Sequence, residues 1–160
     1  MAVEFQDFSI QIKEALEGAA IAFLHEAGGE LASQAKDNTR KGTTGQTANA
    51  WSYNVDESKL ETQVGNPLEN AIWEELGTGE YAVNQNGRKK GWWIPVGNGG
   101  ISSSDAQKYH WEKVRKDKDG NITFVFTYGK KPNPALQNAF TVLHPALINR
   151  AEEIVKARLK

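Results

Sequence analysis

The sequence predicts an α+β fold, with an antiparallel sheet of about four strands packed against a long N-terminal helix and a kinked C-terminal helix. Near both ends of the chain, apolar residues recur at steps of three and four, which is typical of amphipathic helices. Between them, apolar and polar residues alternate in paired runs separated by turns, which indicates hairpins. The length of 160 residues favours one domain, 1–160, with an inserted loop at 81–108.

The first element is a helix expected over Phe5 to Lys36. Its apolar stripe consists of Phe8, Ile12, Leu16, Ala19, Phe23, Ala27, Leu31 and Ala35. Gly28 and Gly29 lie inside this pattern, where each costs about 1 kcal/mol relative to Ala. We therefore expect them to mark either a bend or a place where another backbone packs closely. The polar stretch Asp37 to Asn49 that follows is predicted to be a loop.

A hairpin follows this loop. Residues 51–56 and 60–65 alternate in polarity around a turn at 56–59, so we expect two antiparallel strands. Asn66 and Pro67 then provide the cap and first position of a short helix.

The stretch Ala71 to Tyr81 is interpreted as a hinge between the two halves of the chain. The spacing of Ile72, Trp73 and Leu76 predicts one buried helix face, which leaves Glu74 and Glu75 in solvent. In the motif formed by Trp73, Glu74, Leu76, Gly77, Thr78 and Gly79, the two glycines can adopt positive φ and end the helix. An ordinary helix C-cap is the alternative interpretation.

The segment from Tyr81 to Lys108 is irregular, and a loop of this length is usually functional or disordered. Trp92 to Val96 could add an edge strand, because Pro95 lacks an amide donor. Beyond it, strands are expected at 109–116 and 121–128, joined by a tight turn at Asp119-Gly120.

The last helix is opened by the motif Lys131, Pro132, Asn133 and Pro134, with Asn133 as the cap and Pro134 at the first helical position. Its apolar stripe consists of Leu136, Phe140, Leu143, Leu147, Ala151 and Ile154. Pro145 lies within this stripe and is predicted to kink or split the helix near Leu143.

Composition excludes several function classes. The chain has no cysteine, so thiolate chemistry and disulfides are absent. The net charge of −1 gives no overall attraction to DNA or membranes. The longest apolar run, Ala19 to Leu24, is far shorter than a membrane span. His25, His110 and His144 show no metal-ligand spacing, and we expect neither a metal nor a cofactor.

No catalytic constellation is visible, and we expect a protein that is not an enzyme. Glu74 and Glu75 are adjacent on a helix and point about 100° apart, so they do not converge as a carboxylate pair. The glycine-rich stretches match no phosphate-binding loop, and Ser102 to Ser104 lack a nucleophile elbow. A small hydrolase with an unseen site stays an alternative.

Two polar loops are proposed as interaction surfaces. The stronger one holds Arg88, Lys89, Lys90, Trp92 and Trp93, because cations beside aromatic rings can bind single-stranded nucleic acid or anchor a protein partner. A solvated surface over half-buried tryptophans is the third interpretation. The second loop contributes Arg40 and Lys41.

The order of the motifs resembles the gene-ten-like tail-completion, or head–tail joining, family of long-tailed (siphovirus-type) bacteriophages and prophages. The resemblance covers nearly the whole chain. It rests on Thr44-Gly45, Trp51-Ser52-Tyr53, Val64-Gly65-Asn66-Pro67, Trp73-Glu74-Glu75-Leu76-Gly77-Thr78-Gly79, Gly91-Trp92-Trp93 and the run from Phe126 to Leu136. The chain departs from the family pattern at Ala135, where a Phe is usual.

This resemblance implies a structural virion protein that completes the tail and joins it to the head–neck connector as a ring, with a hexamer expected. The implied partners are further copies of itself and the neck, tail-terminator and tail-tube proteins. Double-stranded DNA could pass through the lumen, and no membrane is involved. The implied location is the virion neck, or the host cytoplasm during assembly. We expect residues 84–104, and then the loop 37–49, to form inter-subunit contacts. A nucleic-acid-binding module at 88–93 is the alternative function.

Overall fold

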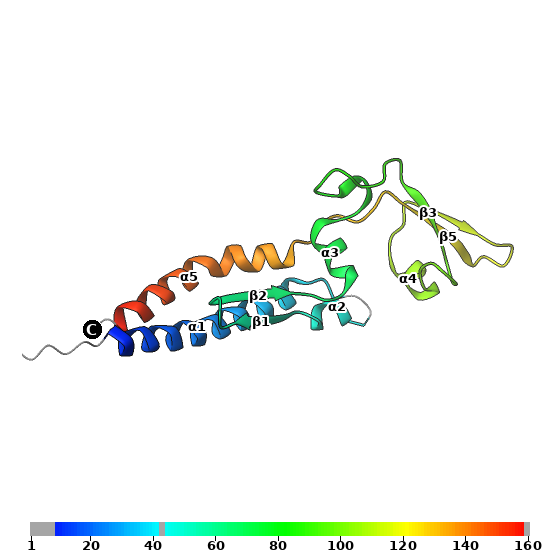
Figure 1. Ribbon diagram of the computed structural model, residues 1–160. Coiled ribbons are helices and arrows are strands. Elements are labelled where there is room, and N and C mark those ends of the chain that lie inside the picture. The colour runs from blue at the N-terminus through cyan, green and yellow to red at the C-terminus, as the bar shows by residue number, and fades with distance from the viewer. Residues whose placement is uncertain (1–8, 42–43, 159–160) are drawn as a thin grey trace, which may run out of the picture. The chain divides into compact units, whose positions relative to one another are not determined.

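The computed structural model describes residues 9–41 and 44–158 and confirms the α+β class (Figure 1). The chain divides into two compact units. Unit 1 contains the residues up to Ala71 and those from Pro134 onward, and unit 2 contains Ile72–Asn133. That residues 1–160 form a single domain stays a prediction.

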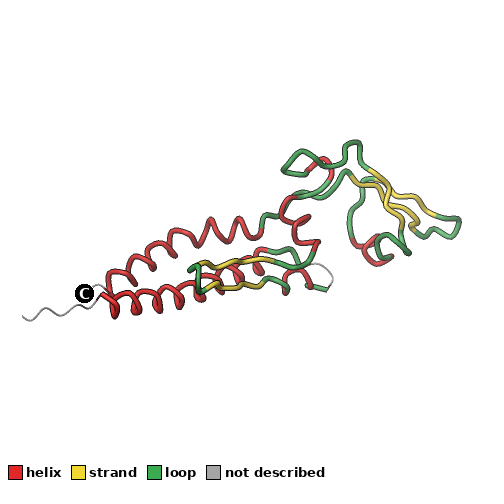
Figure 2. The backbone as a smooth tube through the Cα atoms, viewed as in Figure 1, coloured by secondary structure: helices red, strands yellow, loops and turns green. Residues whose placement is uncertain are grey.

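The strands form two antiparallel sheets instead of the single four-stranded sheet that we expected (strands in yellow in Figure 2). In unit 1, β1 (Ser52–Asp56) pairs only with β2 (Glu61–Gly65). In unit 2, β5 (Ile122–Thr127) lies between β3 (Trp92–Pro95) and β4 (Lys113–Lys116). Both hairpins and the added strand at 92–95 are thus confirmed. The expectation that the two hairpins form one sheet is wrong, because the second hairpin pairs with β3 and not with the first hairpin.

Helix α1 (Ser9–Asn38) is the central element of unit 1, since it packs against β1, β2 and α5 (Ala135–Arg158). The expected helix start at residues 5–8 lies outside the described residues. The core consists of buried Ala27, Leu31, Ala35, Ala139 and Leu147, with Phe23, Trp51, Val64, Leu136 and Leu143 packed around them. Small residues dominate the contact, which lets the two helices approach closely.

Gly28 lies where the hairpin crosses α1, and it is closely packed there, but against side chains and not against another backbone as expected. A Cβ atom at position 28 would lie 2.6 Å from Cδ2 of Tyr53 and 2.7 Å from Oγ1 of Thr62. Both distances are shorter than any ordinary contact, so only glycine fits under these two strands. At Gly29, by contrast, the nearest ring atom of Tyr53 would be 3.6 Å away.

Polar contacts complete unit 1. Thr39 is buried, donates to the carbonyl of Ala35 at 2.7 Å, and accepts a hydrogen bond from the Trp51 indole at 2.7 Å. This fixes the chain between α1 and β1, where α2 (Gln46–Asn49) interrupts the expected loop. Arg150 on α5 contacts Glu30 and Glu26 on α1, and both carboxylates raise its pKa.

Helix α5 runs from Ala135 to Arg158 without a break at Pro145, so it is not split as one of the sequence expectations had it. Proline removes one backbone hydrogen bond. The contacts of Leu143 and Leu147 with the core lie on either side of it and hold both halves of the helix against α1.

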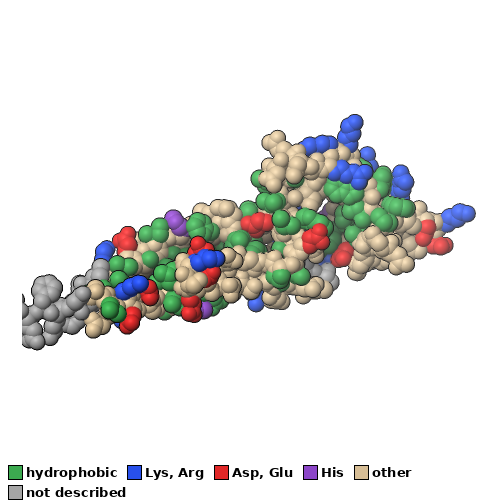
Figure 3. Space-filling model, in the orientation of Figure 1, with side chains coloured by type: hydrophobic (Ala, Val, Ile, Leu, Met, Phe, Trp, Pro, Cys, Tyr) green, Lys and Arg blue, Asp and Glu red, His purple; other side chains and the backbone are tan. Residues whose placement is uncertain are grey.

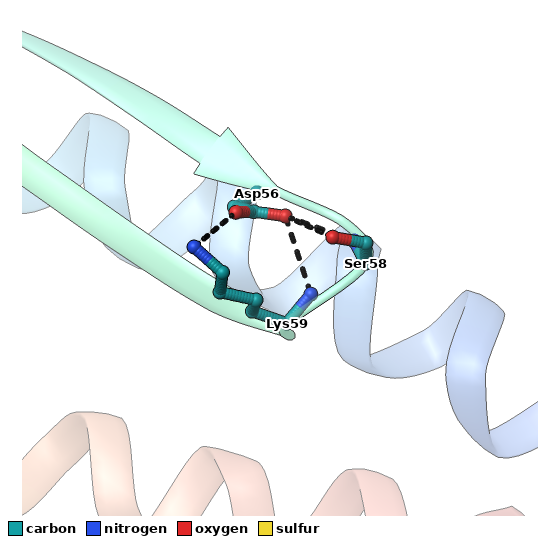
Figure 4. Close-up of polar contacts among 3 residues, drawn as sticks. All are labelled: Asp56, Ser58 and Lys59. Atoms are coloured by element: carbon teal, nitrogen blue, oxygen red, sulfur yellow. Dashed lines mark hydrogen bonds and ion pairs between the residues drawn. The ribbon is translucent and has the colours of Figure 1, made fainter.

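The β1–β2 turn is closed by a single carboxylate (Figure 4). Oδ1 of Asp56 accepts hydrogen bonds from the Ser58 hydroxyl at 2.6 Å and from the backbone amides of Ser58 and Lys59. Oδ2 lies 3.2 Å from Nζ of Lys59. The hydrogen bond from Ser58 and the contact with Lys59 lower the pKa of Asp56 below its ordinary value of 3.8.

Unit 2 begins within α3 (Glu69–Leu76), and η1 (Gly79–Tyr81) follows. The segment expected to be a loop also contains α4 (Ser103–Lys108), which Ser102 caps by accepting from the amide of Asp105 at 3.1 Å. Helix α4 packs on β5, whose Val125 is fully buried. The strand expected from residue 109 begins only at Lys113, because residues 109–112 lead from α4 into β4.

Replacing Gly28 by alanine is expected to destabilise the protein by about 1–3 kcal/mol, because the new methyl group overpacks the contact with Tyr53 and Thr62. Gly18→Ala is the matched control. It is helical with no atom within 4 Å of the added Cβ, so it should gain about 1 kcal/mol. Urea unfolding measures both free energies. Equal stability of the two variants would contradict the packing argument.

Asp56→Asn is expected to lower the free energy of unfolding at pH 7, and to lower it less as the pH falls below 3.8. The folded-state pKa of Asp56 is depressed, so its charge stabilises the turn above the unfolded pKa near 3.8. This contribution is lost as the pH falls through the folded-state pKa. Urea unfolding at several pH values measures the difference, with Glu57→Gln as the charge-matched control. A wild-type–variant difference that is constant with pH would count against the assignment.

Candidate partner-binding site

Two motifs that lie about fifty residues apart in the sequence meet in unit 2. The amide of Thr78 donates to the carbonyl of Lys130 at 2.9 Å, and the amide of Glu80 donates to the carbonyl of Tyr128 at 2.8 Å. In return, the amide of Lys130 donates to the Thr78 hydroxyl at 2.9 Å. The amide of Asn133 donates to the carbonyl of Glu74 at 2.6 Å. We call this contact between residues 74–80 and 128–133 the clasp.

Glycine is required on both sides of the clasp. Gly77, Gly79 and Gly129 have φ values of 70°, 62° and 119°, in the left-handed region. A Cβ at Gly79 would overlap the carbonyl oxygen of Tyr128, and one at Gly129 would overlap the carbonyl oxygen of Thr78. The backbones therefore pack in direct contact, and the glycines do more than end α3.

The predicted burial of α3 is wrong for Ile72, Trp73 and Glu74. Ile72 is 55% exposed and Trp73 is 49% exposed, whereas the side chain of Glu74 is only 20% exposed and its Oε1 pairs with Nζ of Lys130. Its other oxygen is buried and has no hydrogen-bond partner among the described residues. The helix turns this way because the clasp lies on the Glu74 side, which leaves Ile72 and Trp73 as exposed apolar residues.

The clasp lies beside the boundary between the units, which falls between Ala71 and Ile72 and again between Asn133 and Pro134. The sequence interpretation of this stretch as a hinge stays a prediction. Its position at the boundary is what a hinge requires, but the clasp itself is a fixed point within unit 2.

One face of the unit 2 sheet carries a row of aromatic side chains. Trp93 lies opposite Phe126 in the register, and their ring centroids are 5.2 Å apart in an edge-on contact. Phe126 makes a second edge-on contact with Tyr128, also at 5.2 Å. Phe124 lies on the same face and is 39% exposed.

Cations from β4 lie over these rings. Lys113 is opposite Phe126 in the register, and its Nζ lies 5.5 Å from the Phe126 centroid. Arg115 reaches across β5 from the far edge of the sheet, with Cζ 4.3 Å from the Trp93 centroid. Such contacts are cation–π interactions. We call the set Trp93, Lys113, Arg115, Phe124, Phe126 and Tyr128 the basic–aromatic face.

The charge of the chain is divided between the units. Ten of the 19 Lys and Arg residues but only seven of the 20 Asp and Glu residues lie in Ile72–Asn133, so unit 2 carries +3 and unit 1 carries −4. Figure 3 shows Lys and Arg side chains beside hydrophobic ones on the part of the molecule that contains β3 and β5. The net charge of −1 conceals this separation.

An aromatic cleft of about 420 Å³ lies beside β3 and β5, and Phe126 of the basic–aromatic face is part of its lining. Trp92, Tyr109 and Trp111 line it, with Glu112 and Lys130 at its polar parts. The Trp111 indole donates to the carbonyl of Ala106 at 3.1 Å, which fixes this wall to α4. Such a cleft suits an apolar side chain of a partner better than a reaction that needs converging titratable groups.

The structure brings together only part of the predicted site. Arg88 lies over Trp92, with Cζ 5.7 Å from the ring centroid, whereas Trp92 and Trp93 point to opposite faces of the sheet. Lys89 and Lys90 are exposed. Arg40 and Lys41 are exposed and belong to unit 1.

Sequence reasoning missed Lys113 and Arg115. Their alternation along the strand, together with the turn at Asp119-Gly120, contained the necessary signal. A two-stranded register counted outward from that turn places both cations on the face of Phe124 and Phe126.

Within the described residues, no group of three potential metal ligands lies together, and no helix is long and apolar enough to cross a membrane. Models of protein families, curated proteins and solved structures were all compared with this chain, and none matches it.

Gly79→Ala is expected to open the clasp and loosen unit 2, because the added methyl group overlaps the Tyr128 carbonyl. Gly99→Ala is the control, since Gly99 has a similar φ of 78° but open space around it. The control isolates the backbone strain of about 1 kcal/mol. Hydrogen exchange of the β5 amides should accelerate in Gly79→Ala well beyond the control. Equal exchange would show that steric contact in the clasp is unimportant.

Proposed function

We propose that this protein is a structural component of a bacteriophage particle that completes the tail and joins it to the head–neck connector as a ring of subunits. It acts there by binding, without catalysis or a cofactor. Its partners are copies of itself, the neck and tail-terminator proteins, and the tail tube, and it works in the virion neck after assembly in the host cytoplasm.

The observation that carries this proposal is the clasp. The two longest motifs of the family resemblance, residues 73–79 and the run from Phe126 to Leu136, contain most of the residues that the clasp joins. Their residues pair through the backbone and make close contacts at the glycines. A motif used in this way specifies a scaffold, which agrees with a structural protein better than with an enzyme.

The exposed surface also supports an assembly role. Ile72, Trp73 and Phe124 are 55%, 49% and 39% exposed. Phe140 and Val142 on α5 add further exposed apolar surface at 46% and 67%. Exposed apolar residues are common singly, but aromatic residues are enriched where proteins bind one another. Both units offer such residues, as a subunit with neighbours on two sides requires.

A nucleic-acid-binding module at residues 88–93 is the weaker candidate. Binding to single strands uses stacking of bases on open aromatic faces. One face of Trp92 is occupied by Arg88, and one face of Trp93 by Arg115. The positive charge of unit 2 favours an anionic partner without specifying which kind.

The native mass of the purified protein tests this proposal. We expect the 17.7-kDa chain to form a closed ring, about 106 kDa for six copies, alone at high concentration or on mixing with tail-tube protein. Light scattering across a concentration series measures the mass, and negative-stain microscopy shows closure. A strict monomer that binds neither tail nor connector components would refute the proposal.

A further inference from the structure

We propose that the basic–aromatic face of unit 2 docks against carboxylates of the net acidic unit 1 in a second copy of this chain. The contact is head-to-tail and rests on the ring of the proposed function, to which it assigns one interface. It moves the expected contact from the loop tips at 84–104 to the face of the sheet.

The face offers cations whose positions are already fixed. Arg115 is exposed, yet its guanidinium is held 4.3 Å from the Trp93 centroid. Lys113 is held in the same way over Phe126. A guanidinium that lies over a ring still presents its N–H edge outward, where a carboxylate can accept two hydrogen bonds. Because less side-chain freedom is lost on binding, such a group binds anions at a lower entropic cost.

The same contacts favour carboxylates over nucleobases. A base would have to stack on Trp93 or Phe126, but the cations lie over these rings and the edge-on contacts of Phe126 with Trp93 and Tyr128 bring ring edges against ring faces. Carboxylates need only the outward edges of the cations, which stay accessible. The face therefore suits an acidic protein surface.

A second copy of the chain is the occupant that the charges indicate. Unit 1 carries −4 and unit 2 carries +3, so each chain contains a net acidic and a net basic unit. A ring of identical subunits needs two different complementary patches on each subunit. Opposite net charges on the two units favour contact between unlike units, and they disfavour contact between two like units.

Zero-length cross-linking tests which surface meets this face. Normal and ¹⁵N-labelled full-length protein are mixed, treated with a carbodiimide that couples amines to carboxylates, and digested for mass spectrometry. We expect mixed-isotope peptides that join Lys113 to carboxylates of unit 1. Mixed-isotope links from Lys113 to carboxylates within 72–133 only, or no mixed-isotope link from Lys113, would overturn the proposal.

Charge reversal tests the energetic role of the face. Lys113→Glu with Arg115→Glu is expected to weaken self-association about tenfold or more in sedimentation experiments. Lys89→Glu with Lys118→Glu is the control, since it makes the same charge change at exposed residues outside the face and should have little effect. The neutral pair Lys113→Gln with Arg115→Gln guards against misfolding, and should weaken association less than the reversal. Equal effects of face and control variants would overturn the proposal.

Binding of oligothymidylate tests the alternative that this face binds nucleic acid. If the wild-type protein binds it and the charge-reversed face variant does not, the face is a nucleic-acid site and the proposal is wrong. Failure here is separable from failure of the proposed function. A ring that is unchanged by the face variant would refute the interface and leave the joining function intact. Cross-links from Lys113 to unit 1 in a protein that binds neither tail nor connector proteins would support the interface and refute the joining function.

Discussion

The clasp is the interaction on which the rest of unit 2 depends. Thr78 and Lys130 exchange two hydrogen bonds, and Gly79 and Gly129 let the two backbones come into contact. Everything between them, including the three-stranded sheet and α4, starts and ends at this crossing. Backbone pairing of this kind tolerates few substitutions, because any side chain at these glycines would enter the space of the opposite carbonyl. The clasp therefore fixes the direction in which the chain enters and leaves the segment that contains the sheet.

Local patterns in the sequence located the long helices and both hairpins but missed α2 and α4, and long-range pairing could not be read from them. Alternation and turn residues located both hairpins and the strand at Trp92–Pro95. The division into two sheets depends on which strand pairs with the second edge of β5. The periodicity of one segment does not specify which distant segment pairs with it. The same limit explains the error at α3. Spacing identified Ile72 and Trp73 as one helix face, but the burial of Glu74 follows from Lys130, which lies far along the chain.

The candidate site shows the same division between local and distant information. The basic run at Arg88 to Lys90 was conspicuous because its charges are adjacent in sequence. Lys113 and Arg115 were not, although the register gives them the closer relation to Phe126 and Trp93. A run of adjacent charges can be recognised in the sequence. A charged sheet face can be recognised only when the pairing of two strands is known. The overall charge of −1 likewise concealed two oppositely charged units.

The hydrogen bond between Glu74 and Asn133 also brings together the two places where unit 2 leaves and rejoins the rest of the chain. Once those ends are joined, the cost of enclosing more residues grows only with the logarithm of their number. Insertions or deletions between the clasp residues should thus cost little conformational entropy. This makes the segment a permissive position in the chain, where evolution or a designer could exchange one module for another while the helical unit keeps its own core.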